Sequence, residues 1–475
     1  MKILYVTSEA APYAASGGLG DVMGALPLAV GESRQNITTE VILPLYDSIK
    51  ECYKENLVKV IDLSFNLSWR STGATVYKLQ NENTTYYFVE NHYYFGRGKL
   101  YGEYDDGERF AFFSTAVIEF LIATGNIPDV LHANDWQTAL TVIYLKTKYK
   151  NLPLLSKIRT VYTIHNIEYQ GKYDLAILGD VFALDNCYEE TVRYDNCINL
   201  TKGAITLSDY VTTVSPNYAN ELHHDFFSFG LSNIIREAAG KISGVINGID
   251  YTYFSPDVGG DIYFPYTRRA YKTGKANNKK ALQKELGLDI NKEVPLAVMI
   301  TRLTEGKGID LVLNIIEELL LENIQIVILG TGEKSYEHTF SSLENKYPNF
   351  KALIKFDRVL SKKMYAAADI FIMPSKSEPC GLAQMIACSY GTVPVVRAVG
   401  GLYDTIIPYG NENANGFTFD NYNAHELLFT VKKALEIYAD KSEWSNLVKR
   451  TINSNFSWNK SALKYIEIYE NLLNR

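Results

Sequence analysis

The sequence predicts an α/β protein with two doubly wound, Rossmann-like domains. The first observation is length, because 475 residues exceed what one ordinary core holds, so two domains of roughly 200 residues or more are expected. The second is a strand, helix and strand in one stretch: an apolar run at Leu296–Ile300, helical spacing from Leu311 to Leu321, and an apolar run at Ile324–Leu329. The third is that strand-like and helical segments alternate along both halves, which indicates parallel sheets.

Each half contains a series of short apolar runs that we interpret as strands. In the first half they are Ile3–Thr7, Glu40–Leu45, Thr85–Val89, Asp129–His132, Thr160–Ile164 and Tyr210–Val214, with helices expected at Phe110–Ala123 and Trp136–Tyr149. In the second half they are Leu296–Ile300, Ile326–Leu329, Ala352–Phe356, Ile370–Met373, Pro394–Arg397 and Gly416–Phe419. A boundary is predicted between Asn247 and Lys280, where a turn leads into a proline-containing and then a lysine-rich stretch. We expect domains at residues 1–246 and 247–457, a terminal segment at 458–475, and a cleft between the domains.

Composition narrows the classes of partner. The net charge is −7, and no basic cluster is long enough to follow a phosphate backbone, so nucleic acid is excluded as a partner. The five cysteines are odd in number and widely spaced, which indicates free thiols in a reducing compartment. The apolar run at the N-terminus is too short for a signal peptide, and no apolar span approaches the ~20 residues of a membrane helix. We therefore expect a cytoplasmic protein with no membrane partner.

Two cations, Arg302 and Lys307, follow the predicted strand Leu296–Ile300. Parallel sheets bind ligands outside the carboxyl ends of their strands, and a helix N-terminus at the same place adds N–H donors and partial positive charge. The position therefore suits an anionic group such as a diphosphate. On this stretch alone, the alternative that both are solvated loop charges stays open.

Polar residues follow two strands of the first half. His132, Asn134 and Asp135 lie at the end of one strand, and His165 and Asn166 follow another. Polar side chains at neighbouring strand ends are typical of a ligand site that faces a cleft. A single histidine in such a place is more often structural, and only the two strands together favour function.

A glycine turn follows the first strand. Gly17, Gly18 and Gly20 come before a predicted helix and would let the backbone approach a ligand. Gly18, Gly20 and Gly24 are spaced one residue too long for a dinucleotide fingerprint. A tight connection between strand and helix explains the turn equally well.

Two further motifs lie at strand ends in the second half. Glu378 follows the strand Ile370–Met373, where its carboxylate can accept hydrogen bonds from sugar hydroxyls or stabilise positive charge on a ring. An acid in the first turn of a helix, favourable to the helix dipole, is the alternative. Gly400, Gly401 and Leu402 follow the strand Pro394–Arg397 and open another helix, which offers N–H donors.

In combination these motifs closely resemble those of bacterial glycogen synthases and plant starch synthases, which are retaining glucosyltransferases of the GT-B fold. The resemblance extends over nearly the whole chain. It rests on S-G-G-L-G-D-V from Ser16, Y-G-E-Y-D-D-G-E-R-F from Tyr101, H-A-N-D-W from His132, T-I-H-N-I-E-Y-Q-G from Thr163, V-T-T-V-S-P from Val211, I-N-G-I-D from Ile246, T-R-L-T-E-G-K-G from Thr301, S-E-P-C-G-L from Ser377, V-G-G-L-Y-D-T from Val399 and F-S-W-N-K-S-A from Phe456.

The resemblance implies a role for each matched residue. The catalytic residues would be Arg302 and Lys307 on the distal phosphate, Glu378 on the glucose, and Asp135 and His165 facing the transferred glucose. The donor would also contact Ser16, Gly17, Gly18, Asn247, Cys380, Gly381, Gly400, Gly401 and Leu402. Tyr101 would line the acceptor side. The last helix, around Lys460–Leu473, would cross back to the N-terminal domain.

The implied chemistry needs no cofactor and no metal. A departing phosphate can be stabilised by two cations and a helix N-terminus, and the sequence contains no D-x-D triplet of the kind that metal-dependent transferases commonly use. The resemblance favours attack from the leaving-group face, with the phosphate accepting the proton of the acceptor; double displacement remains open.

One residue departs from the family pattern. The family usually has lysine in the turn K-x-G-G-L, and this chain has Ala15 there. A charge-assisted contact is worth ~1.5–3 kcal/mol, which is roughly 10- to 150-fold in affinity. We expect a synthase that uses ADP-glucose and an α-1,4-glucan (glycogen). The alternatives are a glucosyltransferase that prefers UDP-glucose, and a low-activity paralogue that binds glucan.

Overall fold

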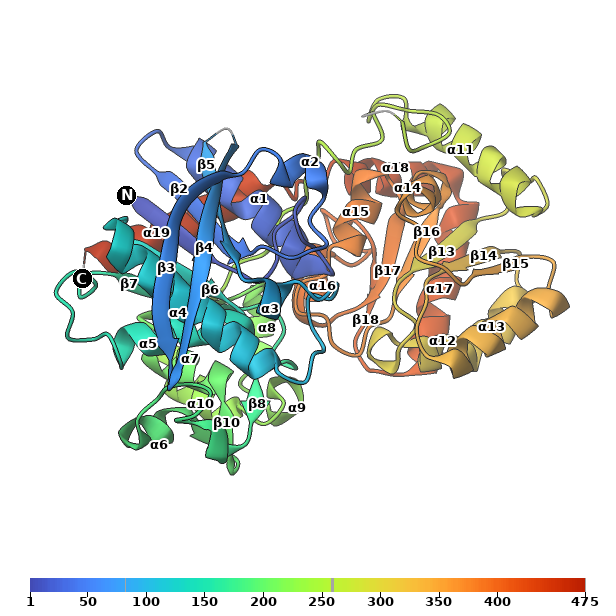
Figure 1. The fold of residues 1–475 in the computed structure, drawn as a ribbon. Coiled ribbons are helices and arrows are strands. Elements are labelled where there is room, and N and C mark those ends of the chain that lie inside the picture. Colours follow the sequence, from blue (N-terminus) through green and yellow to red (C-terminus); the bar gives the residue numbers. More distant parts are fainter. Residues whose placement is uncertain (82, 258–259, 475) are drawn as a thin grey trace. The chain divides into compact units, whose positions relative to one another are not determined.

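The computed structural model describes residues 1–81, 83–257 and 260–474, which form two compact units (Figure 1). The first unit comprises Met1–Gly248 together with Trp458–Arg475, and the second comprises Ile249–Ser457. Each unit has its own sheet covered by helices, as a doubly wound fold requires. None of the helices in the described ranges has the length and apolar content needed to cross a bilayer.

The first unit is built on a mixed sheet in the order β12-β11-β7-β6-β1-β2-β5-β4-β3. The pairs from β12 to β5 are parallel, and β4 is antiparallel to both β5 and β3. The strands are β1 (Lys2–Val6), β2 (Thr38–Pro44), β3 (Val58–Leu67), β4 (Arg70–Asn81), β5 (Thr84–Glu90), β6 (Val130–Asn134), β7 (Arg159–Ile164), β11 (Tyr210–Thr213) and β12 (Ile242–Gly244). A small antiparallel sheet adds β8 (Lys172–Tyr173), β9 (Arg193–Tyr194) and β10 (Cys197–Asn199).

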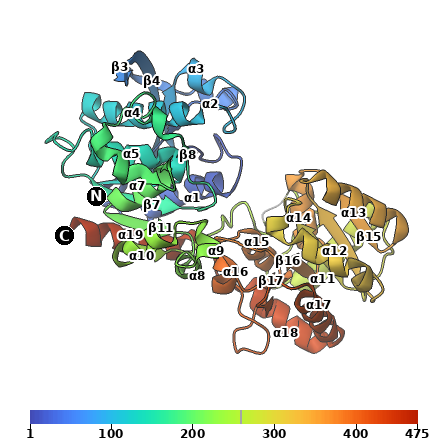
Figure 2. The same cartoon turned by 90° about the horizontal axis from the view of Figure 1, so that it is seen from below.

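The β3–β4 hairpin was not predicted. Its strands form the antiparallel edge of the sheet, and the hairpin packs on α4 (Asp106–Thr124; Figure 2). Along β3, Leu63, Phe65 and Leu67 are buried and alternate with exposed polar residues. This period of two is typical of a strand with one solvated face, whereas the predicted strands are continuous apolar runs buried on both faces.

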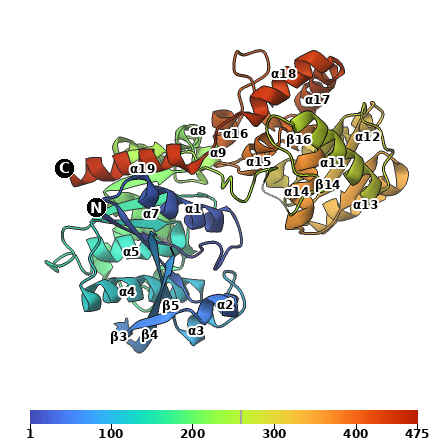
Figure 3. The same cartoon turned by 90° about the horizontal axis from the view of Figure 1, so that it is seen from above.

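Helices cover both faces of the first sheet. They are α1 (Gly18–Ser33), α2 (Glu51–Lys54), α3 (His92–Phe95), α4, α5 (Trp136–Lys146), α6 (Glu189–Val192), α7 (Leu200–Leu207), α8 (Pro216–Glu221), α9 (Asp225–Ser228), α10 (Ser232–Glu237) and α19 (Trp458–Leu473). The last of these, α19, lies beside α1 (Figure 3). It buries Tyr465, Ile466 and Tyr469 against this unit, so the end of the chain completes the core of the first unit.

The second unit contains a parallel sheet in the order β15-β14-β13-β16-β17-β18. Its strands are β13 (Leu296–Ile300), β14 (Gln325–Leu329), β15 (Phe350–Leu353), β16 (Ile370–Met373), β17 (Val393–Arg397) and β18 (Phe417–Phe419). Its helices are α11 (Tyr271–Leu286), α12 (Ile309–Leu320), α13 (Lys334–Lys346), α14 (Arg358–Ala367), α15 (Ala383–Ser389), α16 (Gly400–Thr405), α17 (Ala424–Ala439) and α18 (Lys441–Ile452).

One predicted strand is displaced. The strand expected at Ala352–Phe356 begins two residues earlier and ends at Leu353, because Asp357 caps α14 by accepting from the Leu360 N–H at 2.9 Å. The preceding residues, including Phe356, are therefore in the connection to that helix. The βαβ unit β13-α12-β14 is present as predicted, since the apolar face of α12 is buried on the sheet.

Candidate functional site

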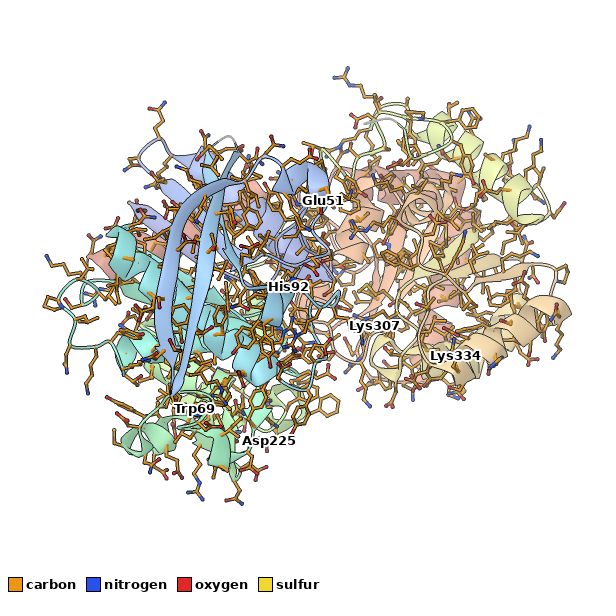
Figure 4. All side chains as sticks on the ribbon, in the orientation of Figure 1. Glu51, Trp69, His92, Asp225, Lys307 and Lys334 are labelled. Carbon is orange, nitrogen blue, oxygen red and sulfur yellow. The ribbon has the colours of Figure 1, made fainter. Side chains whose placement is uncertain are left out.

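The first group of predicted residues lies at the carboxyl end of β13 in the second unit. Arg302 follows this strand and is exposed, and among the described residues its guanidinium has no ion-pair partner. Lys307 lies in the loop between β13 and α12 (Figure 4). It donates from Nζ to Glu378 Oε2 at 2.6 Å, which joins two residues that are 71 positions apart.

Glu378 is held by two donors on the same oxygen. Ser375, which is fully buried, donates from Oγ to Oε2 at 3.0 Å, in addition to the bond from Lys307. The other oxygen, Oε1, has no hydrogen-bond partner within the part of the chain that the structure describes. Because Glu378 is 8% exposed, the carboxylate is fixed in place and leaves one oxygen for a ligand.

Backbone contacts lock the loops that carry this pair. A Cβ at Gly308, where φ is +73°, would lie 2.2 Å from the carbonyl oxygen of Pro374, so only glycine permits the approach. The Lys376 N–H donates to the Gly306 carbonyl at 3.0 Å. The loops after β13 and β16 therefore form one backbone framework beneath Lys307.

The glycines after β17 pack on the turn that holds Glu378. A Cβ at Gly400 would lie 2.0 Å from the Glu378 carbonyl oxygen, and one at Gly401 would lie 2.0 Å from that of Cys380. The Gly401 N–H donates to the Glu378 carbonyl at 3.1 Å, and the Leu402 N–H donates to Val399 at 3.0 Å. These two N–H groups are therefore used within the protein, and a ligand would have to share or replace their bonds.

The turn itself is fixed by α15. Gln384 donates from Nε2 to the carbonyls of Cys380 at 3.1 Å and Gly381 at 2.8 Å. Gly381 has φ +72°, and a Cβ there would meet Gln384 Oε1 at 2.5 Å. Cys380 is buried beside this turn. The predicted residues Glu378, Cys380, Gly381, Gly400, Gly401 and Leu402 are thus adjacent in space.

The second group lies at the carboxyl ends of β6 and β7 in the first unit. Asp135 has φ +58°, a conformation that is rare for a residue with a side chain and that often marks functional positions. Its Oδ1 accepts from the N–H groups of His165 at 2.7 Å and Asn166 at 3.5 Å. Burial raises the pKa of Asp135 to about 7, and burial lowers that of His165 to about 3. His165 is therefore neutral, and its Nε2 lies 2.9 Å from Asn134 Oδ1.

His132 belongs to the core instead of this site. It lies inside β6 and is fully buried, with Nδ1 2.8 Å from Tyr469 Oη and Nε2 2.5 Å from Thr163 Oγ1. Burial lowers the pKa of His132 to about 3, so the ring is neutral. The sequence analysis grouped His132 with the polar residues that face a ligand site, and this was wrong. Its side chain instead connects the sheet to Tyr469 on α19.

Glu9 was not singled out from the sequence, and it organises the glycine turn. Its carboxylate accepts from Ser16 N at 2.5 Å, from Ser16 Oγ at 2.8 Å and from Tyr101 Oη at 2.5 Å. A longer bond of 3.4 Å comes from the Gly17 N–H. Glu9 is 3% exposed, and a charged residue shortly after the buried strand β1 was the signal that could have identified it.

The rest of the glycine turn is open. Gly17 and Gly18 are exposed, and a Cβ at either would meet no atom within 4 Å. Ala15 is half-buried, and its Cβ is the nearest atom to a Cβ built at Gly20, at 2.5 Å. Close packing of Ala15 on Gly20 thus holds the first residue of the turn against α1.

Tyr101 is positioned by a buried arginine. Arg109 on α4 forms an ion pair with Asp106 at 2.5 Å and donates to the carbonyls of Leu100 at 3.2 Å and Lys99 at 3.3 Å. These bonds hold the loop on which Tyr101 lies. Burial raises the pKa of Tyr101 well above its ordinary value, so its phenol is neutral and donates to Glu9.

Asn247 lies at the end of the first unit, where it is 4% exposed. Within the described residues its Oδ1 is buried without a hydrogen-bond partner, which is unusual for a buried polar atom. Among the same residues, no group of three or more His, Cys, Asp or Glu side chains is arranged to hold a metal ion.

Comparison with known proteins identifies the family to which this two-unit fold is similar. The model of the starch synthase catalytic domain matches residues 2–237, and the model of glycosyl transferases group 1 matches residues 283–451. Glycogen synthase of Clostridium novyi (strain NT) is 42% identical, with all of both chains covered. Glycogen synthase of Clostridium botulinum (strain Alaska E43 / Type E3) is 44% identical, with 99% of each chain covered.

A solved structure agrees with the sequence matches. The catalytic domain of starch synthase IV from Arabidopsis thaliana, bound to ADP and acarbose, superposes with a TM-score of 0.90 at 33% identity over 100% of this chain and 99% of that one. The fold and the matched residues define a glycosyltransferase of the GT-B class. The chain belongs to the glycogen synthase and starch synthase family. The resemblance, the fold and the glucosyltransferase activity expected from the sequence are confirmed, with a nucleotide sugar as donor and a glucan as acceptor.

Proposed function

We propose that the enzyme transfers glucose from ADP-glucose to the non-reducing end of an α-1,4-glucan with retention of configuration. The observation that carries the proposal is the Lys307–Glu378 pair, which brings a cation and a carboxylate together at 2.6 Å. The exposed Arg302 lies in the same loop as Lys307. A sugar diphosphate presents an anion next to a hydroxylated ring, and such a pair matches both parts. ADP is bound by the related starch synthase IV, which supports adenosine as the nucleoside.

In this proposal the second unit binds the donor. Arg302 and Lys307 take the distal phosphate, whose negative charge grows as the bond to glucose breaks. Without the donor, Lys307 Nζ bonds to the Glu378 carboxylate. When the donor binds, Nζ contacts both that carboxylate and the distal phosphate. Glu378 then offers Oε1 to a sugar hydroxyl. Cys380, Gly381, Gly400, Gly401 and Leu402 line the donor around this carboxylate.

The first unit supplies the acceptor side. Tyr101, held by Glu9, lines the acceptor, while Asp135 and His165 face the transferred glucose. The neutral His165 has its one N–H on Nε2, facing Asn134 Oδ1, so its Nδ1 can accept a hydrogen bond from a sugar hydroxyl without placing a positive charge beside the developing oxocarbenium ion. Ser16, Gly17, Gly18 and Asn247 complete the contacts to the donor. Asn247 Oδ1 finds no partner among the residues that the structure describes, and this supports the assignment, because a ligand hydroxyl would satisfy it.

The reaction follows from these positions. The bond between the anomeric carbon and the phosphate oxygen breaks, and the phosphate leaves with the electron pair. The acceptor hydroxyl attacks the same face of the sugar, forms the new glycosidic bond, and gives its proton to the departing phosphate oxygen. No residue takes the role of a covalent nucleophile in this route, and the cations lower the barrier by stabilising the leaving group.

The donor nucleotide is the part of the proposal that Ala15 affects. The family lysine at this position would add a cation beside the glycine turn, and its replacement by a methyl group removes one charge-assisted contact. UDP-glucose is therefore the second candidate donor. The free state of all five cysteines supports the cytoplasm, where thiols stay reduced, as the location.

Parallel assays of nucleoside diphosphate release test the proposal. The enzyme is supplied with ADP-glucose or UDP-glucose, with glycogen as acceptor and a chelator present. Faster release from ADP-glucose is expected, because Arg302 and Lys307 suffice for the phosphate. Faster release from UDP-glucose would overturn the donor assignment, and loss of release with chelator would overturn the metal-free route.

A further inference from the structure

A groove of about 410 Å³ on the second unit is lined by residues of the edge strand β18, helix α17 and the loop before β18. Figure 1 shows where these two elements lie in the fold. Its volume falls within the roughly 300–1,000 Å³ that is typical of ligand sites. Phe417 and Phe419 are buried and form its floor, while Tyr409 and Phe429 form its sides. Within the described residues, the groove is lined by none of the side chains assigned above to donor binding or catalysis.

Aromatic rings dominate one side of the groove. Tyr409 and Phe417 stack with ring centroids 5.2 Å apart and planes at 24°. Phe429 leaves 69% of its surface exposed, which is costly for so large an apolar side chain. Phe429 lies between His425 and Lys433 at intervals of four residues, so the three side chains share one face of α17. The groove therefore presents a ring framed by polar groups.

The charged groups around the rings are of both signs. Asp420 and Lys433 are exposed, and Lys433 Nζ lies 5.8 Å from the centre of the Tyr409 ring. The Glu426 carboxylate is fixed because it accepts from Asn421 N at 2.9 Å and from Asn421 Nδ2 at 2.6 Å. Such a mixed rim favours a neutral, hydroxyl-rich ligand over an anion such as a nucleotide. Sugar rings meet both requirements, because their C–H faces pack on aromatic rings and their hydroxyls bond to carboxylates and amines.

We propose that this groove binds a segment of an α-glucan chain apart from the transfer site and so retains the polymeric acceptor on the enzyme. The inference rests on the glucan acceptor of the proposed function. A second point of attachment raises the effective concentration of chain ends at the transfer site without any change in the chemistry. It benefits long or branched glucans and leaves acceptors too short to reach both sites unaffected.

The test compares Phe429→Ala with Phe429→Trp in the full-length enzyme. We expect Phe429→Ala to weaken glycogen binding, measured by affinity electrophoresis in glycogen gels, about tenfold through loss of the bivalent contact. The KM for glycogen should rise by a similar factor, while kcat and the KM for maltotriose stay unchanged. Phe429→Trp keeps an aromatic face and should retain binding. Phe264→Ala, which removes a 47% exposed phenylalanine elsewhere in the same unit, is the matched control.

Three results would overturn the proposal. Glycogen affinity of Phe429→Ala equal to that of the wild type would show that the groove holds no glucan. A change of oligomeric state in Phe429→Ala, seen by sedimentation, would make the groove a contact between protein chains. An equal loss with maltotriose would place Phe429 at the transfer site. Failure of the proposed function is seen separately, because gel binding needs no turnover.

Discussion

Replacement of Lys307 by alanine removes the cation that contacts Glu378 and, in the proposed mechanism, the departing phosphate. In the free enzyme it leaves the Glu378 carboxylate with Ser375 as its one remaining donor among the described residues. In the transition state it removes one of two cations from the leaving group. The substitution should therefore lower both stability and turnover, and the two losses have separate causes.

The expected loss of stability follows from the burial of the pair, and the expected loss of turnover follows from the lost stabilisation of the leaving group. The side chains of Lys307 and Glu378 are 21% and 10% exposed, which lies between a surface pair and a buried one. Breaking the pair should therefore cost about 1–3 kcal/mol in the free energy of unfolding. Loss of one group that stabilises a developing oxyanion lowers kcat by about 10²–10³-fold.

A second substitution separates the two effects. The double variant Lys307→Ala, Glu378→Gln removes the unpaired charge, so its unfolding free energy should return close to the wild-type value. Its turnover should stay low, because the phosphate still lacks its cation. Lys376→Ala is the matched control: Lys376 pairs with Glu305 at 2.6 Å, but the side chains are 35% and 58% exposed. Its loss should leave the free energy of unfolding close to the wild-type value, because the pair is exposed to solvent.

The assays are urea unfolding and nucleoside diphosphate release at saturating donor. Turnover of Lys307→Ala within about threefold of wild type would refute a role at the leaving phosphate, since even one oxyanion contact is worth more than that. Recovery of turnover together with stability in the double variant would show that the pair serves only to hold the loops.

Three further predictions concern the first unit. Ala15→Lys should tighten ADP binding roughly 10- to 150-fold through a charge-assisted contact; an unchanged Kd in calorimetry contradicts this. The raised pKa of Asp135, about 7, means that the folded state keeps a proton that the unfolded chain loses above about pH 4, so the contribution of Asp135 to the free energy of unfolding falls as pH rises from about 4 to 7. The lowered pKa values of His132 and His165 contribute a rise over the same range. Asp135→Asn should remove the contribution of Asp135 to the dependence of the free energy of unfolding on pH. If urea unfolding at about pH 4 and at about pH 7 gives the variant the same pH dependence as the wild type, the assignment is wrong. Tyr469→Phe should cost about 1–3 kcal/mol by leaving a buried nitrogen of His132 unsatisfied, and an unaltered urea midpoint is the opposing result.

Much of the fold was readable because parallel strands buried on both faces are continuous apolar runs. The strands β1, β13 and β16 were found in this way. The β3–β4 hairpin was missed, since its signal is alternation and the search followed apolar runs. The displaced end of β15 depended on a cap by Asp357, which is a local hydrogen bond that periodicity does not reveal.

The sequence predicts which strand end carries each site residue, but it does not predict the contacts of each side chain. Lys307 and Glu378 were assigned to the same sheet edge, and their contact follows from that topology. His132 was misread because every side chain of a doubly covered strand is buried, and the sequence does not show which helix each one meets. The role of Glu9 could be identified only from the folded glycine turn, because its partners Ser16 and Tyr101 lie 7 and 92 residues away in the sequence.

The position of α19 has a consequence for how the protein is made. Residues Met1–Gly248 are translated first, yet the helix that covers His132 and Tyr5 is translated only after the whole second unit. The second unit, Ile249–Ser457, is an unbroken segment and has its whole sheet available before that helix is synthesised. Until α19 has been synthesised, the first unit lacks the helix whose Tyr465, Ile466 and Tyr469 cover part of its core. The order of synthesis therefore completes the first unit only after the second, and we expect chains truncated before Trp458 to expose apolar core that the full fold buries.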